Sequence, residues 1–249
     1  MDQLTSRNPS TTSPHKILNV GLIGCGDVAQ IIHIPTLLHM RAWYRITYLY
    51  DVSPSALSHC SARIPYAHQT TRDARELCAS ENVDIVFVIN ADEFHAGHAI
   101  CALEHDKFAF VEKPVALTRR DVLAIGEAER KKCVLFKYPG FTVSYESGID
   151  NVPRFDAHIE VYSASKTVKV QYDTPFIKGL PVTIHIAENA DGVYKETTVR
   201  KSYEDPYTLE MKELWGLVAE GKPVKTTVQD ALQDLDIFTM AMQHYYGSK

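Results

Sequence analysis

Small residues recur near the start of the chain at the spacing G-x-G-x-x-A. The stretch consists of Gly24, Cys25, Gly26, Asp27, Val28 and Ala29. At this spacing the first glycine permits a tight turn, the second lets a phosphate approach the backbone, and the small last residue lets a helix pack closely on the preceding strand. The N–H groups and the positive dipole end at the start of that helix attract phosphates. The spacing therefore predicts a loop that binds the pyrophosphate of a dinucleotide.

An acidic residue stands where such a loop needs one. Residues 45–50 (RITYLY) form a predicted strand that ends on Asp51, 22 residues after Ala29. A carboxylate there accepts hydrogen bonds from the hydroxyl groups of the adenosine ribose. It favours NAD(H) over NADP(H), because a 2′-phosphate would meet its charge and neither Val52 nor Ser53 is an arginine that could hold the phosphate. The alternative is a surface turn whose glycines permit positive φ, with Asp51 as a helix cap or turn residue before Ser53 and Pro54.

Further polar residues follow two other predicted strands, residues 83–89 (VDIVFVI) and residues 108–111 (FAFV). Ligands of parallel sheets bind outside the carboxyl ends of the strands, so these residues are predicted to meet the glycine loop in one crevice. A lysine in a partly dry pocket can have its pKa lowered and then move protons. Taken alone, the residues favour a structural alternative, an exposed loop lysine and packed histidines. The candidates are Asn90, Ala91, His95, Glu112 and Lys113.

The elements that position these residues alternate between strands and helices. Strands are predicted at 17–23, 45–50, 64–68, 83–89 and 108–111. Helices are predicted at 27–40 with a bend or split at Pro35, at 54–60, at 71–79 with Thr71 as a cap, from 95 to about 104, and from 118 to about 131. The alternation predicts an α/β fold with a doubly wound parallel sheet in a dinucleotide-binding domain over residues 15–133.

The pattern changes in the second half of the chain. Residues 141–146, 155–163, 167–173, 182–188 and 193–200 alternate apolar and polar residues, which predicts an antiparallel sheet with one exposed face. Two helices follow, at 206–220 and from 228 to about 245. Residues 134–249 are therefore predicted to form a smaller α+β domain, and residues 1–14 a flexible tail without the apolar core of a signal peptide.

The bulk composition is that of an ordinary globular protein. Of 249 residues, 45% are apolar and 23% charged, and 26 basic against 31 acidic side chains give a net charge of -5. This balance predicts no nucleic-acid or membrane partner, and the chain has no apolar run of the roughly 18 residues that span a bilayer. The five cysteines lack C-x-x-C spacing, which predicts free thiols in the cytoplasm and neither a disulfide framework nor a metal site.

Three longer stretches carry a recognisable pattern. They are GLIGCGDVAQIIHIPTL, NADEFHAGHAICALEHDKFAFVEKP and EMKELWGLVAEGKPVKTTVQDALQDL. Together they resemble the Gfo/Idh/MocA family of NAD(P)-dependent oxidoreductases, over nearly all of residues 15–247, and look most like the group found in filamentous fungi. The E-K-P element at 112–114 is the most specific part of this resemblance.

The resemblance implies roles for individual residues. Lys113 would lie beside the nicotinamide and help move the proton of the substrate oxygen, and Glu112 would position that lysine or contact the cofactor. Asn90 and His95 would line the nicotinamide end. The implied reaction is hydride transfer between NAD(P) and a carbinol or carbonyl carbon of a small polyol, sugar, dihydrodiol or secondary-metabolite intermediate. A homo-oligomer formed through the C-terminal sheet is also expected.

The chain departs from the family pattern in one region. In the family a sixth strand and an Asp-x-x-x-His helix complete the catalytic site, whereas here residues 131–133 pass directly to 134–140 (VLFKYPG). A large internal block is therefore expected to be missing, and the second domain to be truncated. His158 and His185 are predicted to lie on the face of the sheet and not to replace the lost histidine. Two functions stay open: an oxidoreductase, which Lys113 favours, and a non-catalytic dinucleotide-binding regulator, which the missing block favours.

Overall fold

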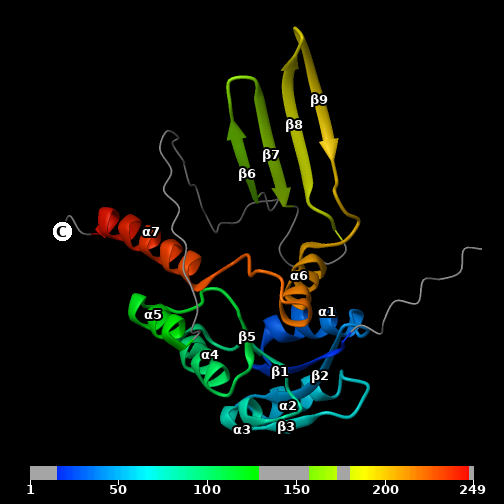
Figure 1. Ribbon diagram of the computed structural model, residues 1–249, viewed down its shortest axis with the longest axis vertical. Helices are drawn as coiled ribbons and strands as arrows, with labels where there is room; N and C mark the ends of the chain where they lie inside the picture. Colours follow the sequence, from blue (N-terminus) through cyan, green and yellow to red (C-terminus); the bar gives the residue numbers. More distant parts are fainter. Residues whose placement is uncertain (1–15, 129–156, 173–179, 247–249) are drawn as a thin grey trace, which may run out of the picture.

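A computed structural model describes residues 16–128, 157–172 and 180–246 of the chain. Figure 1 shows a layered α/β body from which an antiparallel sheet projects. The two parts are linked through the long helix α6, which lies between the projecting sheet and the strands of the body.

The body is built on a five-stranded parallel sheet with the order β3-β2-β1-β4-β5. The predicted doubly wound sheet is confirmed. The chain runs from β1 outward to β3, then returns to the other side of β1, so the order reverses between β1 and β4. Ligands of such sheets bind at this reversal. The strands are β1 (Leu18–Ile23), β2 (Tyr44–Tyr50), β3 (Gln69–Thr71), β4 (Ile85–Val88) and β5 (Phe108–Val111).

Helices cover both faces of this sheet. One face packs against η1, α1 and α2 in a core that includes Leu22, Ile46 and Phe87, and the other packs against α3 and α4 around Ile23 and Val86. Apolar residues on both faces explain why β4 is a continuous apolar run. The elements are η1, a π-helical turn (Ala29–His33), α1 (Ile34–His39), α2 (Pro54–Ser61), α3 (Ala74–Ala79), η2, a 3₁₀ turn (Asp92–Phe94), α4 (His95–Glu104) and α5 (Arg119–Ala128).

The predicted split at Pro35 is confirmed, and it takes the form of a change in hydrogen bonding. The π-helical turn η1 ends at His33, where the N–H of Ile34 donates to the carbonyl of Ala29, and Pro35 lies in the first turn of α1. Proline has no N–H to donate, so it is tolerated at the start of a new helical segment and not inside a continuous one.

Two local predictions are wrong. The third strand is Gln69–Thr71 and not residues 64–68, because Ile64 packs its side chain into the core while the polar residues that follow pair with β2 at the sheet edge. The cap of α3 is Asp73, whose carboxylate accepts from the N–H of Arg75. Thr71 was the expected cap, but its hydroxyl group donates to Glu76 instead.

The second sheet is an antiparallel meander with the order β6-β7-β8-β9, as predicted. Its strands are β6 (Ala157–Tyr162), β7 (Lys166–Tyr172), β8 (Thr183–Ala190) and β9 (Val193–Val199). The predicted strand at 141–146 lies outside the described residues. Asp191 and Gly192 join β8 to β9 with φ of 54° and 78°, the positive angles that a two-residue hairpin loop needs.

The last two helices, α6 (Pro206–Glu220) and α7 (Val228–Tyr246), pack against the first part of the chain. Met211 and Trp215 of α6 lie in the core beside β1, and the Trp215 indole N–H donates to the carbonyl of Lys16 at 2.8 Å. Leu232 of α7 is buried against α4 and α5. The expected division at residue 133 stays a prediction, and both terminal helices contact the residues that precede it.

Candidate active site

The glycine loop crosses directly above the end of β4. Gly24 follows β1 with φ of +112°, and a Cβ placed on it would lie 2.7 Å from the backbone N of Asn90. Its own N–H donates to the carbonyl of Tyr50 at 2.9 Å, at the end of β2. A residue without a side chain is therefore required for the ends of three strands to meet here.

The same loop leaves room on its outer side. A Cβ on Gly26 would meet nothing within 4 Å, whereas Cys25 and Ala29 are fully buried beneath the loop. Asp27 and Val28 are exposed at the start of the helical segment. The side-chain oxygen of Asn90 is a buried acceptor that has no hydrogen-bond partner in the described structure. An open cradle at Gly26, and an unsatisfied acceptor on the residue that Gly24 contacts, fit a dinucleotide that brings its pyrophosphate and hydroxyl groups to this loop.

The side chain of Asp51 is hydrogen-bonded to the backbone of two loops, the glycine loop and the turn before α2. Its carboxylate oxygens accept from the backbone N–H groups of Cys25 and Ser53, each at 2.8 Å. The alternative made Asp51 a helix cap or a turn residue: the cap is the hydroxyl group of Ser53, which accepts from the N–H of Ala56, whereas the bond from the N–H of Ser53 to Asp51 is a turn contact. Each carboxylate oxygen can accept a second hydrogen bond, so the ribose role stays open to Asp51 while it also shapes the glycine loop.

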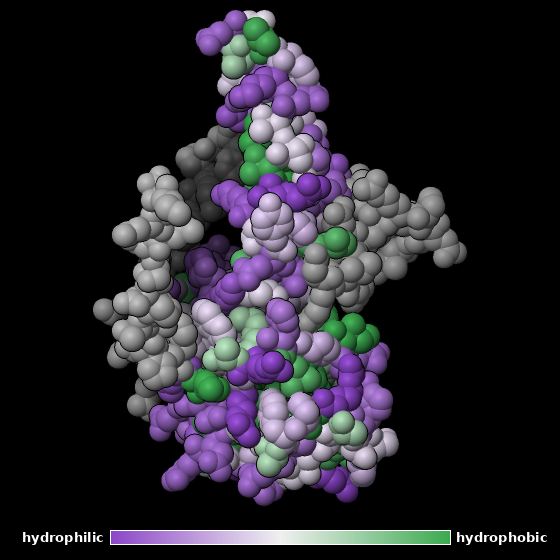
Figure 2. Space-filling view, turned by 90° about the vertical axis from the view of Figure 1, so that its right-hand side faces the viewer, coloured by the Kyte–Doolittle hydropathy of each residue, from purple (hydrophilic) through white to green (hydrophobic). Residues whose placement is uncertain are grey.

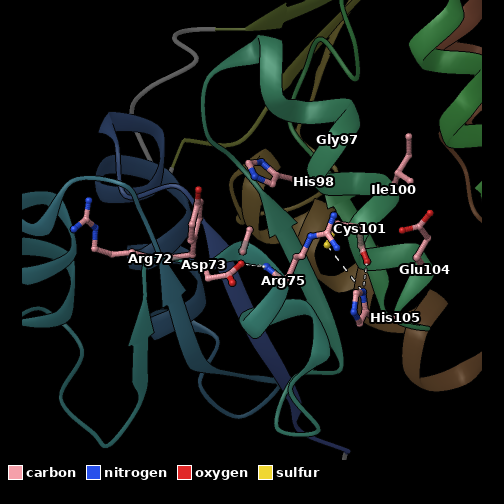
Figure 3. Close-up of a pocket in the computed structure, with 11 residues that line it drawn as sticks. Arg72, Asp73, Arg75, Gly97, His98, Ile100, Cys101, Glu104 and His105 are labelled. Atoms are coloured by element: carbon pink, nitrogen blue, oxygen red, sulfur yellow. Dashed lines mark hydrogen bonds between the residues drawn. The ribbon is translucent and has the colours of Figure 1, made fainter.

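A hollow of about 660 Å³ borders this end of the crevice, between the start of α3 and the outer side of α4. Figure 3 shows the side chains that line it, which include Arg72, Arg75, His98 and Cys101. The ring of His98 lies edge-on to Tyr50, and its Nδ1 is 3.1 Å from the amide nitrogen of Asn90. Burial lowers the pKa of His98, so the neutral ring can accept from that amide.

Lys113 follows the carboxyl end of β5, on the same side of the parallel sheet as the glycine loop that follows β1. The N–H of Glu112 donates to the carbonyl of Val88, which continues the pairing of β5 with β4 by one residue. One carboxylate oxygen of Glu112 accepts from the N–H of Lys113 at 3.1 Å, and the other lies 2.8 Å from Nε2 of His33. The hydrogen bond from His33 is the main reason why the pKa of Glu112 lies below its usual value. The side chain of Lys113 itself is exposed.

His95 is placed differently from a residue that lines a ligand. Its ring is 1% exposed, with Nδ1 2.7 Å from the carbonyl of Pro114 and Nε2 3.0 Å from the carbonyl of Asn90. Both nitrogens face backbone oxygens, so the ring connects the turn after β4 to the turn after β5. Ala91 is exposed in the first of these turns. His95 therefore holds these two turns together from inside the protein.

Three other histidines lie on the second sheet or beside Glu112. His158 and His185 lie exposed on β6 and β8 of the second sheet, as predicted. No role for His33 was predicted from the sequence, although a single polar residue inside the apolar run IIHIP was a signal for it. Within residues 16–128, 157–172 and 180–246, no group of three or more His, Cys, Asp or Glu side chains could hold a metal ion.

Comparison with known proteins gives a family match over the first half of the chain. Residues 18–138 match the family model described as an oxidoreductase family with an NAD-binding Rossmann fold, GFO_IDH_MocA. Over 203 residues the chain is 27% identical to inositol 2-dehydrogenase from Burkholderia multivorans, an alignment that covers 82% of this chain and 55% of the relative. The chain thus spans about half the length of the curated relatives it matches. The missing internal block and the likeness to fungal members stay predictions, and residues 129–156 lie outside the described part.

Solved structures share the fold. A 3-ketoreductase from Actinomadura kijaniata, in complex with NADP and TDP-benzene, aligns with a TM-score of 0.65 and 12% identity, covering 88% of this chain and 95% of that one. Levoglucosan dehydrogenase, in complex with NADH and levoglucosan, aligns with a TM-score of 0.62 and 16% identity, again covering 88% and 95%. Residues 18–138 thus match the GFO_IDH_MocA oxidoreductase family with an NAD-binding Rossmann fold, and the chain shares the fold of these structures.

Proposed function

We propose that this protein is an NAD-dependent oxidoreductase that transfers a hydride between nicotinamide and a carbinol or carbonyl carbon of a small polyol or sugar. The observation that carries the proposal is that the open cradle at Gly26 and the exposed Lys113 follow strands of one parallel sheet and lie at the same edge. The names of the relatives, an inositol dehydrogenase and a levoglucosan dehydrogenase, support a polyhydroxylated substrate. A dihydrodiol or a secondary-metabolite intermediate with a carbinol or carbonyl group would offer the same reacting carbon.

In this proposal the chain's residues bind and orient while NAD supplies the redox chemistry. The glycine loop holds the pyrophosphate, Asp51 accepts from the adenosine ribose, and Asn90 with Ala91 borders the nicotinamide end. The Lys113 amine accepts the hydroxyl proton of the substrate during oxidation, and the ammonium returns it during reduction. Glu112 and His95 hold the two turns that frame this site.

Two measurements on the full chain test the proposal. Fluorescence titration with NADH and NADPH measures binding, and NADH absorbance follows turnover with myo-inositol, levoglucosan and a panel of other polyols and their ketones. We expect binding of NADH and turnover of at least one polyol. Binding without turnover on any substrate would favour the alternative, a non-catalytic dinucleotide-binding regulator, which the enzyme names of the relatives do not support. Failure to bind either dinucleotide would exclude both.

The preference for NAD is proposed to depend on the charge of Asp51. In Asp51→Asn the affinity for NADH should fall about tenfold, which is 1.4 kcal/mol, while the affinity for NADPH should not fall, because the 2′-phosphate no longer meets a carboxylate. Fluorescence titration with both dinucleotides measures the ratio. Asp84→Asn is the matched control, since Asp84 also accepts from a backbone N–H, that of Asn19, but at the opposite end of the sheet. An equal loss of both dinucleotides in Asp51→Asn would mean that Asp51 only supports the loop.

We further propose a homo-oligomer formed through the second sheet. By strand register, one face of this sheet carries a cluster of apolar residues, next to the ion-paired Lys166, Glu188 and Lys195, and Ile159 and Val161 in the cluster are 58% and 59% exposed. Figure 2 shows some hydrophobic residues among hydrophilic ones along this projecting part. Apolar patches of this kind are typical of interfaces. The residues of the apolar cluster are Ile159, Val161, Val168, Val170, Ile184, Ile186 and Val199. Sedimentation of the full chain as a monomer at micromolar concentration would contradict the proposal.

The cellular setting is a proposal as well. Four cysteines of the described chain are free thiols, which supports a reducing compartment such as the cytoplasm. Among the helices of the described residues, none is both long and apolar enough to cross a membrane.

A further inference from the structure

A buried histidine joins the phosphate-binding helical segment to the turn that carries Lys113. The side chain of His33 is 2% exposed, and its Nε2 lies 2.8 Å from a carboxylate oxygen of Glu112. The ring packs edge-on against Phe87 of β4 and Phe110 of β5, with centroid distances of 5.7 and 5.5 Å. Aromatic neighbours on two strands leave the imidazole little freedom, so its direction toward Glu112 is set by the core.

The position of His33 follows from the local sequence. It is the last residue of the π-helical turn η1, which follows the glycine loop and ends just before Pro35. A π-helical turn contains one more residue than an α-helical turn, so it changes the face on which the next side chain lies, and such turns are frequent at functional sites. Because η1 begins at Ala29 of the loop, His33 is held at a constant position relative to the pyrophosphate cradle.

Glu112 is held at both of its oxygens. One oxygen faces Nε2 of His33, and the other accepts from the backbone N–H of Lys113 at 3.1 Å. The pKa of Glu112 is lowered, chiefly by the hydrogen bond from His33, so the carboxylate stays ionised at neutral pH. A continuous set of contacts therefore runs from the glycine loop through His33 and Glu112 to the backbone of Lys113.

The surroundings of Glu112 make the histidine contact important. The helix α6 presents Glu210 and Tyr207 to the same region. Desolvation raises the pKa of Glu210, the charge of Glu112 raises it further, and His33 lowers it. The two carboxyl groups therefore repel each other, and the His33 N–H is the side-chain donor that, together with the N–H of Lys113, favours the observed position of Glu112. Without this contact, Glu112 should turn toward solvent and release the N–H of Lys113.

We propose that His33 is a positioning residue for Lys113. By holding Glu112, it fixes the turn from which the Lys113 ammonium projects, relative to the loop that anchors the cofactor. The inference rests on the proposed function, in which Lys113 moves the substrate proton. Displacement of a reacting group by about 1 Å can cost about 100-fold in rate, so a small shift of this turn matters for turnover and much less for cofactor affinity.

Two substitutions at His33 separate its hydrogen bond from its packing. His33→Phe fills the slot between Phe87 and Phe110 but has no N–H, whereas the amide of His33→Gln can still donate to Glu112. We expect His33→Phe to lower kcat about 10- to 100-fold with the Kd for NADH changed by less than about threefold. His33→Gln should recover most of the kcat. His39→Phe, the same change at an exposed position of α1, is the matched control and should keep wild-type kcat.

Three results would overturn the inference: wild-type kcat in His33→Phe, an equal loss in His33→Gln, or a Kd for NADH that rises by the same factor as kcat falls. If His33→Phe does not fold, as judged by circular dichroism, Glu112→Ala takes its place and must show the same loss of kcat. If the wild type turns over no substrate, hydrogen exchange at the Lys113 amide decides. That exchange should accelerate about tenfold or more in His33→Phe and not in His39→Phe, and an unchanged rate would refute the contact independently of the proposed function.

Discussion

Lys113→Ala is expected to lower kcat for hydride transfer by about 10²- to 10⁴-fold, the usual contribution of a positioned proton-transfer group. The affinity for NADH should change little, because the side chain of Lys113 is exposed and its turn is held through the backbone N–H that Glu112 accepts. The loss should therefore appear in kcat and not in the Kd for NADH.

A second substitution at the same position separates charge from proton transfer. Lys113→Arg keeps the positive charge, but a guanidinium does not release its proton in a protein, so it should not restore kcat. Lys107→Ala is the matched control, since Lys107 precedes β5 at the opposite end of the strand. Steady-state kinetics with the polyol that the wild type turns over, together with NADH titration, measure both quantities. Activity of Lys113→Ala within about tenfold of the wild type would exclude Lys113 as the proton-transfer group.

Gly24→Ala is expected to destabilise the folded protein by about 2–4 kcal/mol, a large part of the usual stability of a domain. The backbone has φ of +112°, and the new Cβ would lie 2.7 Å from the N of Asn90 and 2.8 Å from the carbonyl oxygen of Ile89. Both are backbone atoms at the end of a central strand, so they cannot move aside as a flexible side chain could. The free energy of unfolding in urea measures the effect.

Gly26→Ala is the matched comparison within the same loop. A Cβ at Gly26 meets nothing within 4 Å, so the free energy of unfolding should change by less than about 1 kcal/mol. The methyl group would nevertheless occupy the space proposed for the pyrophosphate, and the affinity for NADH should fall about tenfold or more. Equal stability losses in the two variants, or wild-type NADH affinity in Gly26→Ala, would contradict the assignment of folding to Gly24 and cofactor approach to Gly26.

Much of the fold was predictable because it is determined by local patterns. The strand Phe108–Val111 and the helix Pro206–Glu220 have the predicted boundaries, since an apolar run in the one and a Pro and Gly at the ends of the other are local signals. The prediction was wrong for the third strand, whose position is decided by backbone pairing with β2. Residues 64–68 have the apolar character of a strand, yet Gln69–Thr71 pairs with β2. Strand propensity yields to the partner that the sheet edge provides.

The sequence by itself determined the order of elements, the glycine loop with Asp51 at its distance, and the presence of Lys113 after a buried strand, because these depend on residue types and spacing along the chain. Only the tertiary structure decided what those residues touch. It placed His33 against Glu112, 79 positions apart, and Trp215 on the carbonyl of Lys16, 199 positions apart. It also turned both ring nitrogens of His95 to backbone oxygens. Such contacts join segments that have no local relation, and they form only when the packed core brings those segments together.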